Sequence, residues 1–244
     1  MIPTLIKKIM IKSANIATQP SRINVLSKMI DSVYDQFDVI RVYLNEFDSV
    51  PEFLNREKIT AWQGIGMDLT DNGKFFGMGG RRFTLVNVEP EYYFTLDDDI
   101  IYPPDYVEKT VENIDKFGCI ITYHGRLLRG KGLRYYKDHE FFSCVWESKE
   151  DFEIDVCGTG VTAFRTDYFC PNNLALHEHQ RMSDIIFSLE AAKQGKTIGY
   201  CKKAAHWIKP LEVNESIYSH FTKNRNDVQN KLADEIFTIK YGKV

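Results

Sequence analysis

The sequence of 244 residues has little of what marks secreted, disulfide-stabilised or membrane-spanning proteins. Its five cysteines are odd in number, lie far apart and form no Cys-x-x-Cys pair, which argues against a disulfide framework and a cysteine zinc site. No segment approaches the roughly 20 apolar residues that a membrane-spanning helix needs. Residues 1–10 lack the long apolar core and the cleavage site of a signal peptide, so we expect none. These absences favour a cytoplasmic location and leave a peripheral membrane contact open.

The chain also lacks a strong charge of either sign. Its 31 Lys and Arg stand against 34 Asp and Glu, a formal net charge of -3, which gives no general attraction to nucleic acid or to anionic membranes. We find no internal repeat and no low-complexity linker. What is present is an ordinary globular composition with 43% apolar residues, enough to fill the core of one large α/β domain or two small ones.

The apolar residues predict alternating strands and helices, the order typical of a doubly wound, mostly parallel sheet flanked by helices. The expected strands are 9–16, 39–44, 92–96, 119–123, 152–156, 161–164 and 197–200. The expected helices are one that Ser21 caps, then 104–117 with Gly118 as its stop, 183–195 and 226–241. In the last of these, Val228, Leu232, Ile236 and Ile239 should share one apolar face.

The most informative feature is a run of three carboxylates, Asp97, Asp98 and Asp99, directly after the apolar segment 92–96. Clustered like charges repel one another, so such a group is usually tolerated where a cation neutralises it. Alternation along a strand would put Asp97 and Asp99 on one side, at the strand end where open α/β sheets bind ligands. Carboxylates suit Mg²⁺ or Mn²⁺, ions that commonly carry a diphosphate. The alternative is an acidic turn that opens the helix near Pro104.

Two polar loops each have a structural and a functional interpretation. The segment Asp71-Asn72-Gly73-Lys74 is typical of a surface turn; alternatively, Asp71 hydrogen-bonds a base or ribose and Lys74 faces phosphate. Gly158-Thr159-Gly160 interrupts an apolar stretch, which indicates either a bulge or the wall of a pocket that a ligand approaches closely.

Two single residues are candidates of the same kind. Asp184 begins the helix at 183, where a carboxylate either complements the helix dipole or acts as a general base towards an incoming hydroxyl. His206 lies in an apolar setting, where a histidine is more often a core residue than a metal ligand.

The segment 124–139 interleaves basic and aromatic residues, namely Arg126, Arg129, Lys131, Arg134, Tyr135, Tyr136 and Lys137. Such interleaving can bind single-stranded nucleic acid or a phosphate-bearing acceptor. We expect a solvated, mobile loop instead, and the acidic balance of the whole chain makes nucleic acid the weaker functional option.

The order of these motifs resembles the GT-A-fold nucleotide-sugar glycosyltransferases, particularly bacterial family 2-like enzymes, over residues 13–210. The motifs are Thr18-Gln19-Pro20-Ser21-Arg22, Asp71 to Lys74, Asp97 to Asp99, Gly158 to Gly160, Asp184 and His206. The resemblance implies a GT-A-like (Rossmann-like) catalytic domain at 1–210. A C-terminal helical extension at 211–244 would pack on or beside it.

The resemblance also implies roles for residues. Mn²⁺ or Mg²⁺ would bind Asp97 and Asp99, with His206 as a late ligand, and Asp184 would be the base. The donor would contact Thr18, Pro20, Arg22, Asp71, Lys74 and Asp98, and the sugar or acceptor pocket would include Gly158, Thr159 and Gly160. Ser183-Asp184 stands where the family usually has Glu-Asp, so an acceptor contact of that glutamate is lost or falls to the serine.

The implied reaction is metal-dependent transfer of a sugar, with inversion, from a nucleoside-diphosphate sugar to a hydroxyl of a glycan or lipid-linked glycan. A UDP-sugar donor and a role in bacterial lipopolysaccharide or capsule synthesis are favoured, and no nucleic-acid partner is expected. Assembly with a second copy stays open.

Three alternatives remain. A nucleotidyltransferase would need a glycine- and basic-rich triphosphate loop, and 18–22 contains no glycine. A non-catalytic carbohydrate- or nucleotide-sugar-binding protein would keep the pocket without the reaction. A nucleic-acid binder would use 124–139.

Overall fold

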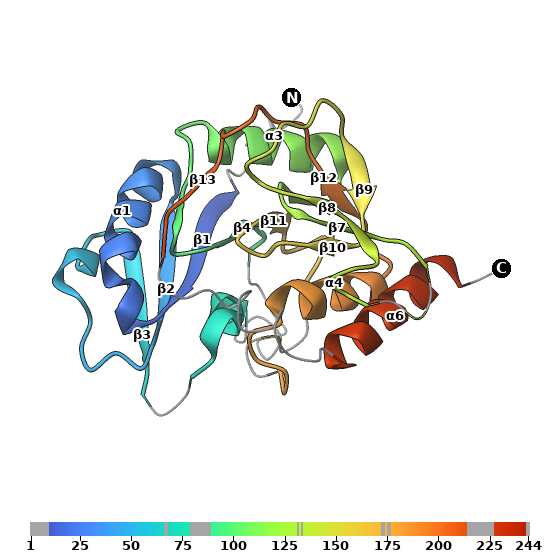
Figure 1. The fold of residues 1–244 in the computed structure, drawn as a ribbon. Coiled ribbons are helices and arrows are strands. Elements are labelled where there is room, and N and C mark those ends of the chain that lie inside the picture. Colours follow the sequence, from blue (N-terminus) through green and yellow to red (C-terminus); the bar gives the residue numbers. More distant parts are fainter. Residues whose placement is uncertain are drawn as a thin grey trace, which may run out of the picture.

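The computed structural model describes residues 10–65, 68–78, 89–130, 132, 134–171, 174, 177–213 and 227–242. An eight-stranded sheet runs through them in the order β3-β2-β1-β4-β11-β6-β12-β9 (Figure 1). Its strands are β1 (Ile11–Thr18), β2 (Val39–Asn45), β3 (Ile59–Gly64), β4 (Glu91–Leu96), β6 (Ile120–Thr122), β9 (Phe152–Ile154), β11 (Val161–Arg165) and β12 (Ile198–Tyr200). The pairs β1–β2, β1–β4, β2–β3 and β6–β12 are parallel, whereas β11 and β9 run antiparallel to their neighbours. The expected mostly parallel α/β sheet is confirmed.

Helices cover both faces of this sheet (Figure 1). The α-helices are α1 (Ile23–Val33), α3 (Tyr106–Phe117), α4 (Ser183–Lys193) and α6 (Asp227–Tyr241), and the 3₁₀ turns are η1 (Pro20–Arg22), η2 (Tyr34–Gln36), η3 (Glu52–Leu54) and η4 (Thr70–Met78). Alternate residues of a strand face opposite sides: Phe94 packs in one core with α1 and α3, and Tyr93 packs in the other with α4 and α6. No helix among the described residues is long and apolar enough to cross a membrane.

Two small sheets lie beside the large one. The strands β7 (Gly125–Leu128), β8 (His139–Phe142) and β10 (Val156–Cys157) form an antiparallel sheet in the order β10-β7-β8. The strands β5 (Ile100–Ile101) and β13 (Lys209–Pro210) form an antiparallel pair. Residues 152–164 therefore do not form one interrupted strand, because β9 and β11 belong to the large sheet and β10 to the small one.

The expectation of a solvated, mobile loop at 124–139 is wrong for β7 and Tyr135, whereas Arg129, Arg134 and Lys137 are exposed and Lys131 lies outside the described residues. Arg126 lies in β7 and is 5% exposed, and Tyr135 is 3% exposed. The guanidinium group of Arg126 lies 4.9 Å from the Tyr135 ring centroid and donates to its hydroxyl at 3.1 Å. Aromatic rings thus replace water around this cation.

Two residues were predicted to mark helix ends, Ser21 at the start of a helix and Gly118 at the end of another, and only the second prediction is correct. Ser21 does not cap a helix: it lies within η1, and α1 follows with no side-chain hydrogen bond at its first turn. Gly118 ends α3 in a left-handed conformation, φ 61°, as predicted.

The buried face of α6 agrees with the expected one except at Val228, because Ile236 is buried and Leu232 and Ile239 are partly buried against the same core. Gln229, Ala233 and Ile236 are its buried residues, whereas Val228 is 37% exposed. The helix packs against α4, and Gln229 donates to the hydroxyl of Tyr136 at 3.1 Å. The contact with Tyr136 explains why the polar residue Gln229 is buried near the start of the helix, where the sequence predicts Val228.

Candidate active site

The three consecutive aspartates, Asp97 to Asp99, are called the triplet below. They follow β4 and lie beside the carboxyl end of the neighbouring strand β1. Because β1 and β4 are parallel, their carboxyl ends share one edge of the sheet. Thr18, the last residue of β1, donates to Asp98 at 2.7 Å, and Arg22 forms an ion pair with Asp99 at 2.7 Å. Pro20 is exposed and begins the turn η1 that brings Arg22 back to the triplet. Thr18 and Arg22 therefore lie beside the triplet.

The second polar loop, in η4, contributes a buried cation. Lys74 is 2% exposed, and its ammonium group pairs with Asp71 at 2.5 Å and with Asp97. Burial opposes the charge of Lys74, but Asp71 and Asp97 together raise its pKa. Burial also raises the pKa of Asp71 to about 6, with further upward contributions from Asp97 and Asp184, although Lys74 lowers it. The ammonium group of Lys74 thus contacts two carboxylates, those of Asp71 and Asp97.

The glycine segment joins β10 to β11 and holds the candidate base. The backbone N–H and the hydroxyl of Thr159 both donate to Oδ1 of Asp184 at 2.8 Å. A Cβ atom at Gly160 would collide with the carboxylate of Asp97. The hydroxyl of Tyr102 donates to the carbonyl of Gly160 at 2.5 Å and accepts from the N–H of Asp97 at 2.9 Å. This turn therefore places Asp97 and Asp184 on either side of the same backbone segment.

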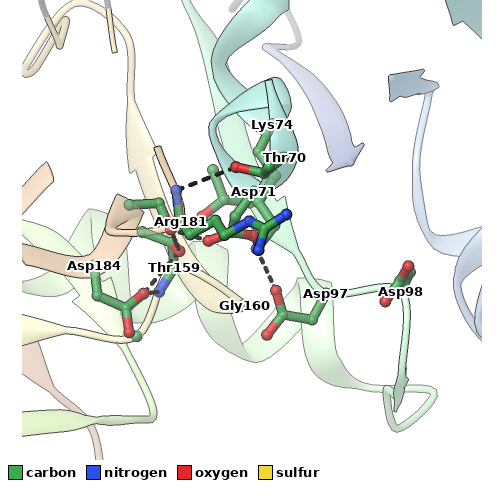
Figure 2. A network of polar contacts seen from close by, with 12 residues as sticks. Thr70, Asp71, Lys74, Asp97, Asp98, Thr159, Gly160, Arg181 and Asp184 are labelled. Carbon is green, nitrogen blue, oxygen red and sulfur yellow. Dashed lines mark hydrogen bonds and ion pairs between the residues drawn. The ribbon is translucent and has the colours of Figure 1, made fainter. Parts of the chain in front are cut away.

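Ser183 closes a continuous chain of polar contacts. It is 2% exposed, its hydroxyl donates to Asp71, and it lies 2.8 Å from the hydroxyl of Thr159. Contacts thus run without a gap in the order Asp97, Lys74, Asp71, Ser183, Thr159 and Asp184. Figure 2 shows Asp71, Lys74, Asp97, Thr159 and Asp184 gathered in one region.

Burial and mutual repulsion both disfavour the ionised form of the aspartates in this run. Burial raises the pKa of Asp98 to about 7; Asp99 and Asp97 add to this, against Thr18 and Arg22, which lower it. Burial and Asp97 likewise raise the pKa of Asp99. Additional positive charge at this site would stabilise the ionised carboxylates.

A closed metal cage is not formed: the described residues contain no cluster of three or more His, Cys, Asp and Glu able to hold an ion. The side chains of Asp97 and Asp99 are 38% and 26% exposed. Mg²⁺ is commonly held by one or two carboxylates together with substrate phosphates. The residues therefore fit an ion that is shared with a diphosphate.

The structure does not bring His206 to this cluster. Its side chain is exposed, and its backbone N–H donates to the carbonyl of Val145 at 2.8 Å. Strand β13 runs antiparallel to β5, so it is Leu211 that lies beside Asp99, donating to its carbonyl at 2.6 Å. Because the two strands are antiparallel, His206 lies beyond the end of β5 that is farther from Asp99.

Sequence reasoning did not single out three residues of this region. Tyr102 ties the triplet to Gly160, and Arg181 extends its side chain into the same group of residues (Figure 2). His124 packs against Gly158. His124 could have been identified as a candidate from its position immediately after the predicted strand 119–123.

Comparison with known proteins agrees with this arrangement. The family model "Glycosyl transferase family 2" matches residues 22–180, more than half of the chain. No curated protein matches the chain. The matched range begins at Arg22, the last residue of η1, contains η4, the three aspartates and the glycine segment, and ends four residues before Asp184. The chain therefore belongs to glycosyl transferase family 2 and is a glycosyltransferase that uses a nucleotide-sugar donor.

Proposed function

We propose that the enzyme transfers a sugar, with inversion and with the help of Mn²⁺ or Mg²⁺, from a UDP-sugar to a hydroxyl of a glycan or lipid-linked glycan. The product would be part of a bacterial surface glycan such as lipopolysaccharide or capsule. With a lipid-linked acceptor, the enzyme would act in the cytoplasm at the inner face of the membrane. The catalytic unit would be residues 1–210, with 211–244 as an extension.

The observation that carries this proposal is the way in which Thr159 holds Asp184. Both donors of Thr159 go to the same oxygen, Oδ1. No described residue donates to Oδ2 of Asp184, which leaves this oxygen available for a proton. A carboxylate fixed at one oxygen and available at the other suits a general base.

In the proposed reaction, Oδ2 of Asp184 takes the proton of the acceptor hydroxyl as its oxygen attacks the anomeric carbon. The new C–O bond forms on one face of the sugar while the bond to the diphosphate breaks on the other, so the configuration inverts. Asp97 and Asp99 would hold the metal ion, which, when bound, stabilises the charge that develops on the leaving diphosphate. The nucleoside would lie along Thr18, Pro20 and Arg22, with Asp98 near the ribose.

Several further residues would set the geometry of this reaction. Lys74 pairs with the carboxylates of both Asp97 and Asp71, and Ser183 connects Asp71 to Thr159. Gly158, Thr159 and Gly160 would form the floor of the sugar pocket. Such positioning supplies a large part of the rate in reactions that join two molecules.

The test compares Asp184→Asn with Asp35→Asn, because Asp35 is an exposed residue of η2 that lies outside the polar contacts described above. A panel of nucleotide sugars with Mn²⁺ first identifies a donor by thermal stabilisation. Asp184→Asn should keep the donor-induced shift and lose at least about 100-fold in transfer rate, since general bases contribute about 10²–10⁴-fold. Asp35→Asn should behave as wild type.

Two results would contradict the proposal. Full transfer activity in Asp184→Asn would remove its role as base. Donor binding without any turnover in the wild-type enzyme, across lipid-linked and free glycan acceptors, would favour a non-catalytic binding protein. The same panel with Asp99→Ala tests the metal, because stabilisation that depends on Mn²⁺ should disappear in that variant.

A further inference from the structure

His124 follows β6 and is held rigidly at the rim of the candidate site. Its carbonyl accepts from the N–H of Gly158 at 2.7 Å and from the hydroxyl of Thr122 at 3.0 Å. Its ring meets Phe141 edge to face at 5.0 Å. A Cβ atom at position 158 would collide with the imidazole. These contacts fix both the backbone and the plane of the ring.

The hydrogen bonds of the ring also define its tautomer. The backbone N–H of Cys144 donates to Nδ1 at 3.3 Å, and a nitrogen that accepts a hydrogen bond has no proton of its own. Burial, followed by the nearby Arg126, lowers the pKa of His124 to about 4, so the ring is neutral near pH 7. The proton of the neutral ring is therefore on Nε2, and no described residue accepts it.

Three side chains surround the tripeptide that joins β10 to β11. Gly158 packs against His124, Thr159 donates to Asp184, and Gly160 packs against Asp97. The outer residues of a tripeptide are at most about 7 Å apart. His124, the candidate base and the carboxylate expected to hold the metal thus border the same small space.

On the proposed function, which this step assumes, that space belongs to the transferred sugar. The anomeric carbon must lie between Asp184 and the diphosphate near Asp97, so the sugar ring covers the tripeptide and its hydroxyls extend towards His124. We propose that His124 is a donor-binding residue whose Nε2–H donates a hydrogen bond to a hydroxyl oxygen of the transferred sugar.

The chemistry of a neutral imidazole agrees with a hydroxyl partner. A phosphate prefers a charged donor, and Arg22 and the metal site provide positive charge at the other end of the triplet. A ring fixed as a donor also discriminates, because a sugar that lacks the hydroxyl, or that presents it in the opposite configuration, leaves the N–H unpaired. His124 would thus contribute to the choice of donor sugar.

The experiment uses two amide variants with opposite geometry. The side chain of His124→Asn can still accept from Cys144 but places no donor at the position of Nε2, whereas His124→Gln can place its amide N–H there. Isothermal titration in the presence of Mn²⁺ would measure the binding of UDP-, GDP- and dTDP-sugars and of the corresponding nucleoside diphosphates to wild type and both variants.

We expect wild type to bind one nucleotide sugar more tightly than its nucleoside diphosphate. His124→Asn should bind the nucleoside diphosphate as wild type does and the nucleotide sugar about tenfold more weakly, the usual effect of one neutral hydrogen bond. His124→Gln should recover part of this loss. The deoxy analogue that lacks the bonded hydroxyl should bind wild type about tenfold more weakly and His124→Asn no more weakly than the intact sugar.

Unchanged affinity of His124→Asn for the nucleotide sugar would overturn the inference, as would an equal loss for the nucleoside diphosphate or a change confined to the KM of the acceptor. In each case the wild-type enzyme would still bind and transfer the sugar, so the proposed function would stand. Failure of wild type to bind any nucleotide sugar would instead overturn the proposed function and this inference together.

Discussion

The lowered pKa of His124 connects a single side chain to the stability of the fold. The pKa falls from 6.5 to about 4 because the half-buried ring is shielded from water and lies near Arg126 and Lys203, while Asp184 and Asp97 act in the opposite direction. Between these two pH values the unfolded chain binds a proton that the folded chain does not bind. The free energy of unfolding therefore falls as the pH falls from 6.5 towards 4.

We expect this effect to reach about 2 kcal/mol at pH 5, at about 1.4 kcal/mol for each pH unit below 6.5. Urea denaturation at pH 7.5 and at pH 5.0 would measure it in wild type and in His124→Gln. The variant should lose about 2 kcal/mol less than wild type over this interval, because its other titrating groups are the same. Equal losses in the two proteins would show that His124 is protonated in the folded state.

For individual residues, the sequence predicted which side chains belong to the site better than it predicted which contacts they make. The order of motifs led to Asp97, Asp98, Asp99, Asp184 and the glycine segment, which the structure gathers in one region. It did not predict that Lys74 would be buried between two carboxylates, since a polar Asn-Gly turn is typical of a surface. The position of His206 depends on the register of β13, which no local pattern encodes.

For the elements, we expect the stability of the C-terminal region to depend on the face of α6 that the structure buries. Ile236→Ala removes a side chain that is 0% exposed in the core shared with α4, and should reduce the free energy of unfolding by about 2–5 kcal/mol. Val228→Ala, on the 37% exposed side, should change it by less than about 0.5 kcal/mol. Chemical denaturation of both variants provides the measurement. An equally large loss for Val228→Ala would show that Val228 is buried, as the sequence predicts.

Elements with a strong periodic pattern were predicted to within two or three residues at their ends. These include β2, β4 and α3, whose apolar residues and terminating Gly118 agree with the structure. The segment 124–139 was not, because the burial of Arg126 depends on tertiary contacts with aromatic rings. Similarly, the division of 152–164 among two sheets depends on which strands lie beside it, and apolar alternation cannot distinguish one sheet from another.

For the whole molecule, the cysteines provide a sensitive probe of the native fold. Cys119, Cys144, Cys157 and Cys201 are buried, and Cys170 is half-buried. Burial raises the pKa of Cys119 and Cys144 to about 11 and that of Cys157 and Cys201 to about 12. Because the thiolate is the reactive form, these four thiols should be unreactive in the folded protein.

We therefore expect Ellman's reagent at pH 8 to modify one thiol rapidly in the native enzyme and five in denaturant. The Cys170→Ser variant should lose the rapid phase and keep its melting temperature within a few degrees. Rapid reaction of two or more thiols in the native protein would indicate that part of the core opens on the timescale of the assay.

The buried ammonium group of Lys74 has one more consequence, which concerns the state of the enzyme before any substrate arrives. Lys74 holds Asp97 and Arg22 holds Asp99 in the folded chain itself. The two carboxylates are thus oriented when the protein folds, and an incoming donor meets dipoles and charges that already point in fixed directions. Little reorganisation energy then remains for the chemical step, which is the condition under which electrostatic stabilisation of a transition state is most effective.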